Sequence, residues 1–264
     1  VYSGKISGNG IFTQKCQKFF EEQYGFKKTL LTTSCTDALE MCAILTQIQA
    51  GDEVIIPSFT FVSTALAFVR QGAKIIFADS RPDHPGINED KIEELITPKT
   101  KAIVPVHYAG VACDMDKIMD IAHKYNLVVI EDAAHAFPVG YKGKMIGTLD
   151  SDVTVFSFYA TKTITTGEGG MLVTKDPKIA ARVRTMRLHG IDRDAFDRYT
   201  SDKPSWYYEI VAPGYKYNMT DIAASIGIHQ LKKADVFKDR RSQIAHAYLK
   251  ELESLPIELP SSYL

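Results

Sequence analysis

Residues 151–170 read SDVTVFSFYATKTITTGEGG, a strand-like run followed by a single lysine and a glycine-rich turn. Val153 and Phe156 belong to the run of β-branched and aromatic residues that is typical of a strand. Small and hydroxyl residues surround Lys162, and the glycines of 167–170 can take positive φ without a steric penalty. A lysine in such a turn can hold its amine against an anionic ligand, although most lysines considered alone are solvated loop residues.

The size and composition of the chain are those of a folded globular protein. Its 264 residues are 45% hydrophobic, and 31 basic side chains balance 32 acidic ones. This length can bury a sizeable core, as one large domain or as one domain plus part of another. The absence of a basic excess argues against a nucleic-acid partner, and no apolar run approaches the length of a membrane span.

Cysteine and histidine usage gives no sign of a disulfide framework or a metal centre. The four cysteines form no C-x-x-C pair, and the seven histidines are scattered without ligand spacing. The opening VYSGKISGNG also lacks the pattern of a signal peptide. We therefore expect reduced thiols in a cytoplasmic protein without a metal site.

Strand-like and helix-like segments alternate along nearly the whole chain. Strands are expected at 29–33, 53–56, 74–78, 102–106, 127–130, 153–158 and 171–173. Helices are expected at 12–24, 38–48, 58–70, 87–96, 115–125, 179–188 and 221–252, with a polar excursion over 192–204. The alternation predicts an α/β protein with a largely parallel sheet flanked by helices.

A possible anion site lies where the first strand leads into its helix. Small hydroxyl residues fill this turn, and free N–H groups at a helix start, with the helix dipole, suit an anion. Ordinary N-capping by Ser34 or Thr36 explains the same residues equally well. Phe59 and Phe61 stand at the next strand-to-helix turn, where aromatics are usually core but one could cover a flat ring.

A carboxylate follows the most apolar strand of the chain. Residues 127–130 read LVVI, which suggests burial on both faces of a parallel sheet. Ligands bind outside the carboxyl ends of such strands, and Asp132 stands at that end. A buried carboxylate needs a cation or strong donors, so a helix cap or a structural ion pair remains an equal alternative. His135 is either a ligand contact or a histidine at the edge of the core.

The candidates Ser34 to Thr36, Asp132, Ser157 and Lys162 fall at corresponding ends of strands. Pyridoxal 5′-phosphate needs this combination, because its phosphate takes an N–H cradle and its ring takes an aromatic cover. Its pyridinium nitrogen takes a carboxylate and its aldehyde takes a lysine. A nicotinamide-dependent oxidoreductase is a weaker alternative, because the first strand–helix turn has no G-x-G-x-x-G.

Several motifs identify the chain as similar to the DegT/StrS family of pyridoxal-phosphate sugar aminotransferases. They are TTSCTDALEM, GDEVIIPSFTFVSTA, AIVPVHYAGVACDMD, VVIEDAAHA, SFYATKTITTGEGG and GYKYNMTD. Residues 30–170 most resemble the dTDP-4-amino-4,6-dideoxygalactose transaminases of the family. The stretch from RLHGIDRDAFDR to APGYKYNMTDI is closer to its UDP-4-amino-4-deoxy-L-arabinose aminotransferases.

The resemblance implies the aspartate aminotransferase-like fold, called fold type I. This is a three-layer structure with a mostly parallel, seven-stranded sheet flanked by helices. It also implies a homodimer with shared active sites, a large domain over 1–235, and a long helix that starts a small domain over 236–264. Relatives extend further at both ends, so we expect the chain to lack an N-terminal segment and most of the small domain.

The resemblance also assigns roles around the cofactor ring. Lys162 is implied to bind the cofactor's aldehyde covalently and then to act as the general base of the reaction. Asp132 is implied to pair with the pyridinium nitrogen and His135 to reach the phenolic oxygen. Phe61, where some relatives carry tryptophan or tyrosine, is implied to stack on the ring.

Four further residues are implied to hold the cofactor's phosphate. Cys35 and Thr36 are expected to give backbone or hydroxyl contacts, and Ser157 a hydroxyl. Asn218 is expected to reach the phosphate of the other subunit's cofactor. Tyr159 replaces a histidine that is common in the family, and no role is assigned to it.

The implied reaction moves an amino group from glutamate to a 4-keto-6-deoxy nucleotide sugar, as in polysaccharide biosynthesis. Sugar dehydrases of the family carry histidine in place of the lysine, so Lys162 favours transamination. Two alternatives stay open: a UDP-4-keto-pentose as the acceptor, and a catalytically idle protein that keeps the fold for binding or regulation.

Overall fold

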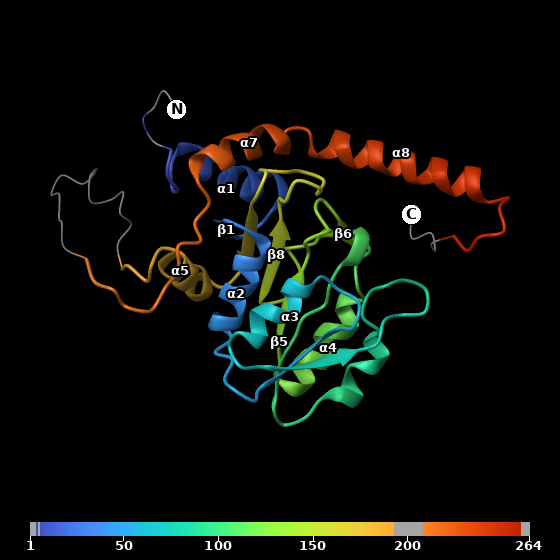
Figure 1. Ribbon diagram of the computed structural model, residues 1–264, viewed down its shortest axis with the longest axis horizontal. Helices are drawn as coiled ribbons and strands as arrows, with labels where there is room; N and C mark the ends of the chain where they lie inside the picture. The colour runs from blue at the N-terminus through green and yellow to red at the C-terminus, as the bar shows by residue number, and fades with distance from the viewer. Residues whose placement is uncertain (1–3, 5, 193–207, 260–264) are drawn as a thin grey trace.

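The computed structural model describes residues 4, 6–192 and 208–259 and contains one seven-stranded sheet (Figure 1). The strand order is β1-β9-β8-β5-β4-β2-β3, and β9 alone runs against the others. A separate two-stranded ribbon pairs β6 with β7. The strands are β1 (Lys28–Thr32), β2 (Glu53–Pro57), β3 (Lys74–Ala78), β4 (Thr100–Ile103), β5 (Val128–Asp132), β6 (Gly140–Tyr141), β7 (Lys144–Met145), β8 (Val153–Ser157) and β9 (Gly170–Thr174).

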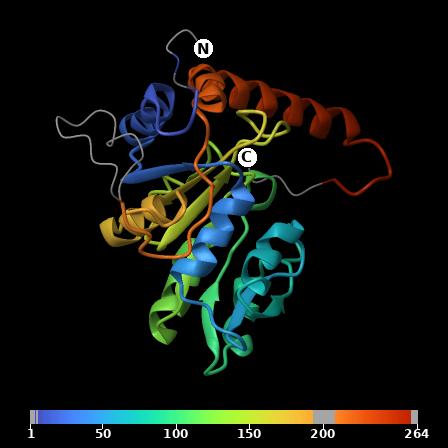
Figure 2. The same cartoon turned by 60° about the vertical axis from the view of Figure 1, so that its left-hand side comes forward.

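Helices cover both faces of this sheet, so the mostly parallel three-layer fold predicted from the sequence is confirmed. Figure 2 shows α2, in blue, packed lengthwise against the strands. The helices are α1 (Ile11–Tyr24), α2 (Cys35–Leu45), α3 (Val62–Val69), α4 (Met115–Tyr125), α5 (Pro177–Met186), α7 (Asp221–Leu231) and α8 (Ala234–Leu252). Short 3-10 turns are η1 (Glu89–Lys91), η2 (Glu93–Leu95) and η3 (Tyr108–Gly110).

The period-two alternation of the strands sends their apolar side chains into two separate cores. Phe156 of β8 and Met171 of β9 join the core beneath α1, α4 and α7. Val155 and Leu172, their neighbours along the same strands, join the core beneath α2, α3 and α5. Central strands such as β8 are buried along their whole length because both faces are covered.

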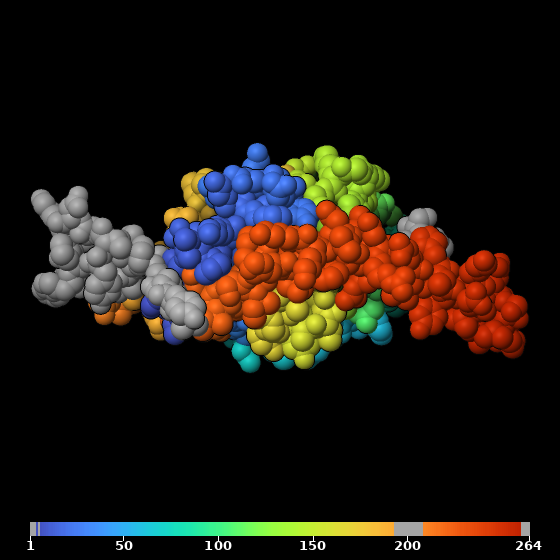
Figure 3. All heavy atoms as spheres, turned by 90° about the horizontal axis from the view of Figure 1, so that it is seen from above, coloured from blue at the N-terminus to red at the C-terminus, as the bar shows by residue number. Residues whose placement is uncertain are grey.

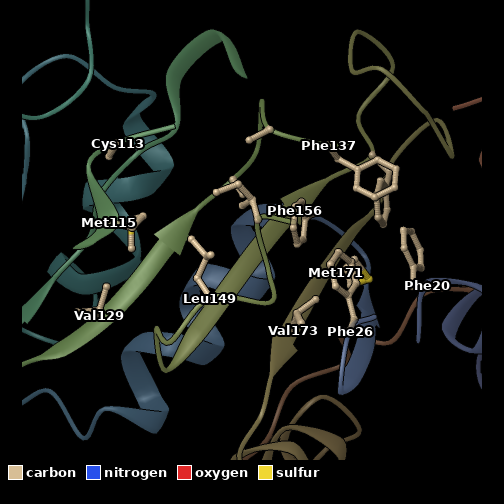
Figure 4. Close-up of a cluster of buried hydrophobic side chains, with 14 of the residues drawn as sticks. Phe20, Phe26, Cys113, Met115, Val129, Phe137, Leu149, Phe156, Met171 and Val173 are labelled. Atoms are coloured by element: carbon tan, nitrogen blue, oxygen red, sulfur yellow. The ribbon is translucent and has the colours of Figure 1, made fainter. Parts of the chain in front are cut away.

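Aromatic rings fill the first of these cores beside the lysine-bearing strand (Figure 4). Phe20 of α1 stacks on Phe158 at 5.6 Å between ring centroids and meets Phe137 edge-on at 5.4 Å. Phe156 packs on Phe26 at 5.5 Å. Each such ring pair stabilises a core by about 0.5–1.5 kcal/mol beyond the effect of burying its apolar surface. The end of β8 is therefore packed against a stable group of aromatic rings.

Two predicted helices begin at different residues from those expected. α2 begins at Cys35 instead of 38, because the Ser34 side chain caps it by accepting from the Asp37 N–H at 3.0 Å. α3 begins only at Val62, although the helix was expected from 58. The Ser58 N–H donates to the Ala78 carbonyl at 2.8 Å, so the chain first continues the pairing of β2 with β3.

The helix predicted over 87–96 is wrong, since the segment forms only the two short turns η1 and η2. Tertiary contacts override the helical pattern here. The buried carboxylate of Glu89 accepts from Arg81 at 3.0 Å and from the Asp114 N–H at 2.8 Å. Ile87 and Ile92 are completely buried on either side of it, and these anchors do not fit a regular helix.

The single helix predicted over 221–252 is instead two helices, α7 and α8. The break falls at Lys233, whose φ of −113° leaves the helical region and whose N–H bonds back to Gln230 at 2.9 Å. Leu231 and Ala234 are both buried and fix the two helix ends on the core. Figure 3 shows the two helices as an orange-to-red band, with the end of α8 extending past the body of the protein.

The excursion predicted over 192–204 falls almost entirely on 193–207, outside the described residues. Within the described part of the chain, no helix has both the length and the apolar character needed to cross a lipid bilayer.

Candidate active site

A cavity of about 630 Å³ opens at the carboxyl ends of the parallel strands. The turns after β1, β2, β5 and β8 all contribute to it, which is where ligands bind in open α/β sheets. Seven of the eight predicted site residues line this one cavity: Cys35, Thr36, Phe61, Asp132, His135, Ser157 and Lys162. Positions more than 120 residues apart in the sequence thus meet at one edge of the sheet.

Asp132 is the last residue of β5 and leaves only 4% of its surface exposed. Its Oδ2 accepts from the Thr64 hydroxyl of α3 at 2.7 Å, and its Oδ1 accepts from the Ala134 N–H at 3.1 Å. No lysine or arginine of the described residues lies within ion-pair distance of it. The described residues therefore give no support to the alternative of a structural ion pair, and two donors hold the carboxylate at the cavity.

The start of α2 forms a second wall of the cavity. Ser34, Cys35 and Thr36 line it, and the Thr36 hydroxyl donates to Ser63 at 2.9 Å. Ser34 caps the helix and also lies at the cavity, so N-capping is confirmed and the anion site stays a prediction. Gly170 of β9 lets the turn approach, because a Cβ there would lie 2.4 Å from the backbone of Ser34 and Cys35.

Lys162 lies in the loop after β8 and lines the same cavity as Asp132. Its N–H donates to the Tyr159 carbonyl at 3.0 Å, which closes a tight turn. Burial lowers the pKa of the Lys162 amine, and the opposing attraction of Cys35 and Asp132 only partly compensates. This loop therefore presents a partly desolvated amine to the cavity.

His135 faces the cavity with its ring orientation fixed. The Ala109 N–H donates to its Nδ1 at 3.2 Å, and its ring meets Tyr108 edge-on at 5.0 Å between centroids. Because Nδ1 accepts, the neutral ring carries its proton on Nε2. Burial, together with the charge of Lys162, lowers the pKa of His135. His135 is therefore better described as a residue of the cavity than as a histidine at the edge of the core.

Phe61 and Ser157 complete the predicted set in the cavity. Phe61 is the residue before α3, and 70% of its surface remains exposed, so its ring is free to cover a ligand. Ser157 ends β8, and its hydroxyl accepts from the Tyr159 N–H at 3.3 Å. Tyr159 also lines the cavity.

Asn218 is the one predicted residue that does not line the cavity. It is buried beside the edge strand β1, where it bridges to Thr32 and accepts from the Lys216 amine. Gly8 packs against it so closely that a Cβ there would overlap the Asn218 amide. Within this chain Asn218 supports the loop before α7, and its expected contact with another subunit stays a prediction.

The described residues around the cavity give little support for thiol chemistry or for a metal site. All four cysteines are buried free thiols, and burial raises the pKa of the Cys35 thiol well above its usual range. No group of three potential metal-ligating side chains exists among residues 4, 6–192 and 208–259.

A model of the DegT/DnrJ/EryC1/StrS aminotransferase family matches residues 1–263, practically the whole chain. The chain belongs to this family. Its similarity to individual members is substantial as well. It is 52% identical over 246 residues to an uncharacterized protein of Methanocaldococcus jannaschii, covering 93% of this chain and 63% of that protein. It is 45% identical over 254 residues to the spore coat polysaccharide biosynthesis protein SpsC of Bacillus subtilis, covering 96% and 64%.

The fold of this family member also matches solved structures. A putative sugar aminotransferase from Streptococcus pneumoniae in its PMP form superposes with a TM-score of 0.87 at 32% identity, covering 96% of this chain and 68% of that one. The PLP form of the same protein gives a TM-score of 0.85. The fold type expected from the sequence is thereby confirmed. The chain spans 63% and 64% of the length of the two curated relatives.

Sequence reasoning missed two residues of the site. Thr64 donates to Asp132 and also bonds Thr60 at 2.9 Å between hydroxyl oxygens, a pair spaced by four residues at the start of α3. The four-residue spacing of Thr60 and Thr64 could have pointed to this pair from the sequence. Tyr108 lines the cavity between Phe59, which it meets edge-on at 4.9 Å, and His135. Tyr108 follows the strand predicted over 102–106, so its place at a strand end was a signal for it.

Proposed function

We propose that this chain is the cofactor-binding part of a pyridoxal 5′-phosphate-dependent sugar aminotransferase. The observation that carries the proposal is that Lys162 and the nearly buried Asp132 line one cavity together with a helix N-terminus. Family membership supports the aminotransferase activity. The PLP and PMP forms of the pneumococcal relative support the cofactor.

The residues of the cavity fit this cofactor by their own chemistry. The start of α2 offers N–H groups near Cys35 and Thr36 for a phosphate, with a hydroxyl from Ser157. The Asp132 carboxylate has no cation of its own among the described residues, so it can accept an N–H from a pyridinium. Phe61 supplies an exposed aromatic face.

Each cavity residue then has a defined task. The bound cofactor supplies an electron sink for carbanion chemistry at the amino-bearing carbon. Asp132 would hold a proton on the ring nitrogen of the cofactor, and Thr64 fixes the position of the Asp132 carboxylate by donating to its Oδ2 at 2.7 Å. Lys162 would bind the cofactor and, once free again, would move protons as a general base, a role that its lowered pKa favours.

His135 has the complementary task of a donor. With Nδ1 occupied by the Ala109 N–H, its Nε2–H is available to a phenolic oxygen in the cavity. Its lowered pKa keeps the ring neutral at physiological pH, so this tautomer persists. His135 thus orients the ring without adding a charge.

The finer identity of the reaction is part of the proposal. We infer that glutamate donates the amino group to a 4-keto-6-deoxy nucleotide sugar, in a cytoplasmic homodimer with shared active sites. Residues 1–235 would form the large domain, and 236–264 would start the small one. The SpsC relative, named for spore coat polysaccharide biosynthesis, supports a role in polysaccharide synthesis.

A spectral titration tests this function. Adding pyridoxal 5′-phosphate to the chain should produce a protein-bound absorbance band that glutamate then converts, as the first half of a transamination. Lys162→Ala should lose both the band and the conversion, whereas Lys178→Ala, an exposed lysine outside the cavity, should keep both. A band that glutamate leaves unchanged would favour the idle binding protein.

A further inference from the structure

A second cavity of about 450 Å³ adjoins the first one across Lys162. The two share Tyr108, Ala134, His135, Ser157, Thr161 and Lys162. Cys35 and Asp132, which are assigned to the phosphate and the pyridinium, do not line the second cavity, although Ser157 lines both. Apolar groups of Phe137 and Ile164 form part of its wall. It therefore offers room for something other than the cofactor beside the same amine.

Arg241 of α8 also lines this cavity. Its guanidinium reaches the loop that carries the lysine, where one N–H donates to the Lys162 carbonyl at a long 3.4 Å. No carboxylate of the described residues lies within ion-pair distance of Arg241, whereas Arg70 and Arg81 each pair with at least one. Most N–H groups of the Arg241 guanidinium are therefore available to a ligand.

The charges around the second cavity have one sign. Lys162 and Arg241 line it together with His135, and no aspartate or glutamate does. A planar guanidinium binds carboxylate and phosphate groups with two parallel hydrogen bonds. Phe137 and Ile164 contribute apolar groups beside it, and polar and apolar groups line the cavity about equally.

We propose that this second cavity is the substrate subsite of the chain and that Arg241 holds an oxyanion of the substrate there. The inference rests on the proposed function, in which the amino donor and the sugar acceptor both react beside Lys162. The donor brings carboxylates and a nucleotide sugar brings phosphates, so one guanidinium can serve either in turn. Arg241, on α8, is thus assigned as a substrate-binding residue.

Consecutive arginines on α8 give a matched control. Arg240 precedes Arg241 but faces elsewhere, with its guanidinium donating to Gln243 at 3.2 Å, and it does not line the cavity. Arg241→Gln and Arg240→Gln therefore remove the same charge from adjacent positions. Arg241→Lys keeps the charge but loses the two-pronged geometry.

The test is isothermal titration of the chain loaded with pyridoxal 5′-phosphate, so that the phosphate cradle of the first cavity is filled. Glutarate serves as an unreactive carboxylate probe and inorganic pyrophosphate as the phosphate probe. We expect at least one probe to bind the unmodified chain and Arg241→Gln to weaken it by about tenfold or more. Arg240→Gln should stay within about twofold, with Arg241→Lys in between. The probe that responds identifies the substrate group.

The subsite is overturned if the loaded chain binds neither probe, if Arg241→Gln binds as tightly as the unmodified chain, or if both arginine variants weaken binding equally. Loading is followed by absorbance before any probe is added. A chain that does not load contradicts the proposed function itself, whereas a chain that loads but shows one of these results contradicts the subsite alone.

Discussion

Glu131 and His107 form a completely buried hydrogen bond of 2.8 Å, between Oε2 and Nε2, on the opposite side of β5 from the cavity. Because side chains alternate along a strand, Glu131 points away from the cavity that its neighbour Asp132 lines. The Cys113 N–H donates to His107 Nδ1 at 3.1 Å, so Nε2 carries the proton shared with the carboxylate. Thr154 donates to Glu131 Oε1 at 2.8 Å. This network fixes the strand end that presents Asp132.

Glu131→Gln should destabilise the chain, because the amide replaces a carboxylate oxygen that accepts from buried donors and leaves one of them poorly paired. We expect a loss of about 2–3 kcal/mol in the free energy of unfolding, measured by urea denaturation followed by circular dichroism. The control is Glu94→Gln, an exposed residue whose ion pair with Lys91 at 3.3 Å contributes little. Equal stability of the two variants would contradict the role of the network.

The same carboxylate predicts how stability depends on pH. Burial raises the pKa of Glu131, but hydrogen bonds from His107, Ser151 and Thr154 outweigh it and hold the pKa below its ordinary value of 4.5. A carboxyl with a depressed folded pKa stabilises fully above the unfolded value and loses that contribution as the pH falls through the folded one. The stability difference between the unmodified chain and Glu131→Gln should therefore shrink below about pH 4.5. Denaturation midpoints from pH 3 to 7 would show it, and a constant difference would contradict it.

Thr64→Val tests the donor that holds Asp132. The substitution keeps the shape of the side chain and removes the hydroxyl that donates to Oδ2 at 2.7 Å. A charge-assisted bond of this kind contributes about 1.5–3 kcal/mol, so we expect about tenfold weaker binding of pyridoxal 5′-phosphate. Thr64→Ser keeps the hydroxyl and should remain within about threefold of the unmodified chain. Similar losses in both variants would assign the effect to packing and not to the donor.

Gly170→Ala tests the close approach of β9 to the start of α2. The added Cβ would lie 2.4 Å from the backbone of Ser34 and Cys35, so the helix start must move. Overpacking of this kind costs about 1–3 kcal/mol of stability, and we expect cofactor affinity to fall as well. Gly140→Ala is the control, because a Cβ there meets only the Lys144 carbonyl at 3.5 Å. Unchanged cofactor affinity in Gly170→Ala would show that α2 does not form the cradle.

The sequence predicted most of the sheet and the cavity because both depend on local patterns. The apolar run before Asp132 and the β-branched run before Lys162 are buried strands, as expected. Since the carboxyl ends of parallel strands share one edge, the polar residues after them had to meet there. The family motifs then assigned a role to each of these residues.

Tertiary contacts decided what the sequence could not predict. The segment around Glu89 has a helical pattern, yet its buried carboxylate and its isoleucine neighbours limit it to 3-10 turns. The break at Lys233 follows from two buried residues that dock α7 and α8 separately. Arg241 reaches the second cavity only because α8 packs beside the strand ends, which no sequence spacing reveals.

We propose that the amine of Lys162 reacts with a cofactor that Asp132 orients. Loading the chain with pyridoxal 5′-phosphate, reducing it with sodium borohydride and mapping the modified peptide by mass spectrometry would identify the reacting lysine. We expect a single pyridoxyl group on Lys162, and much less of it in the Asp132→Asn variant. A label on another lysine, or an equal label in both chains, would contradict it.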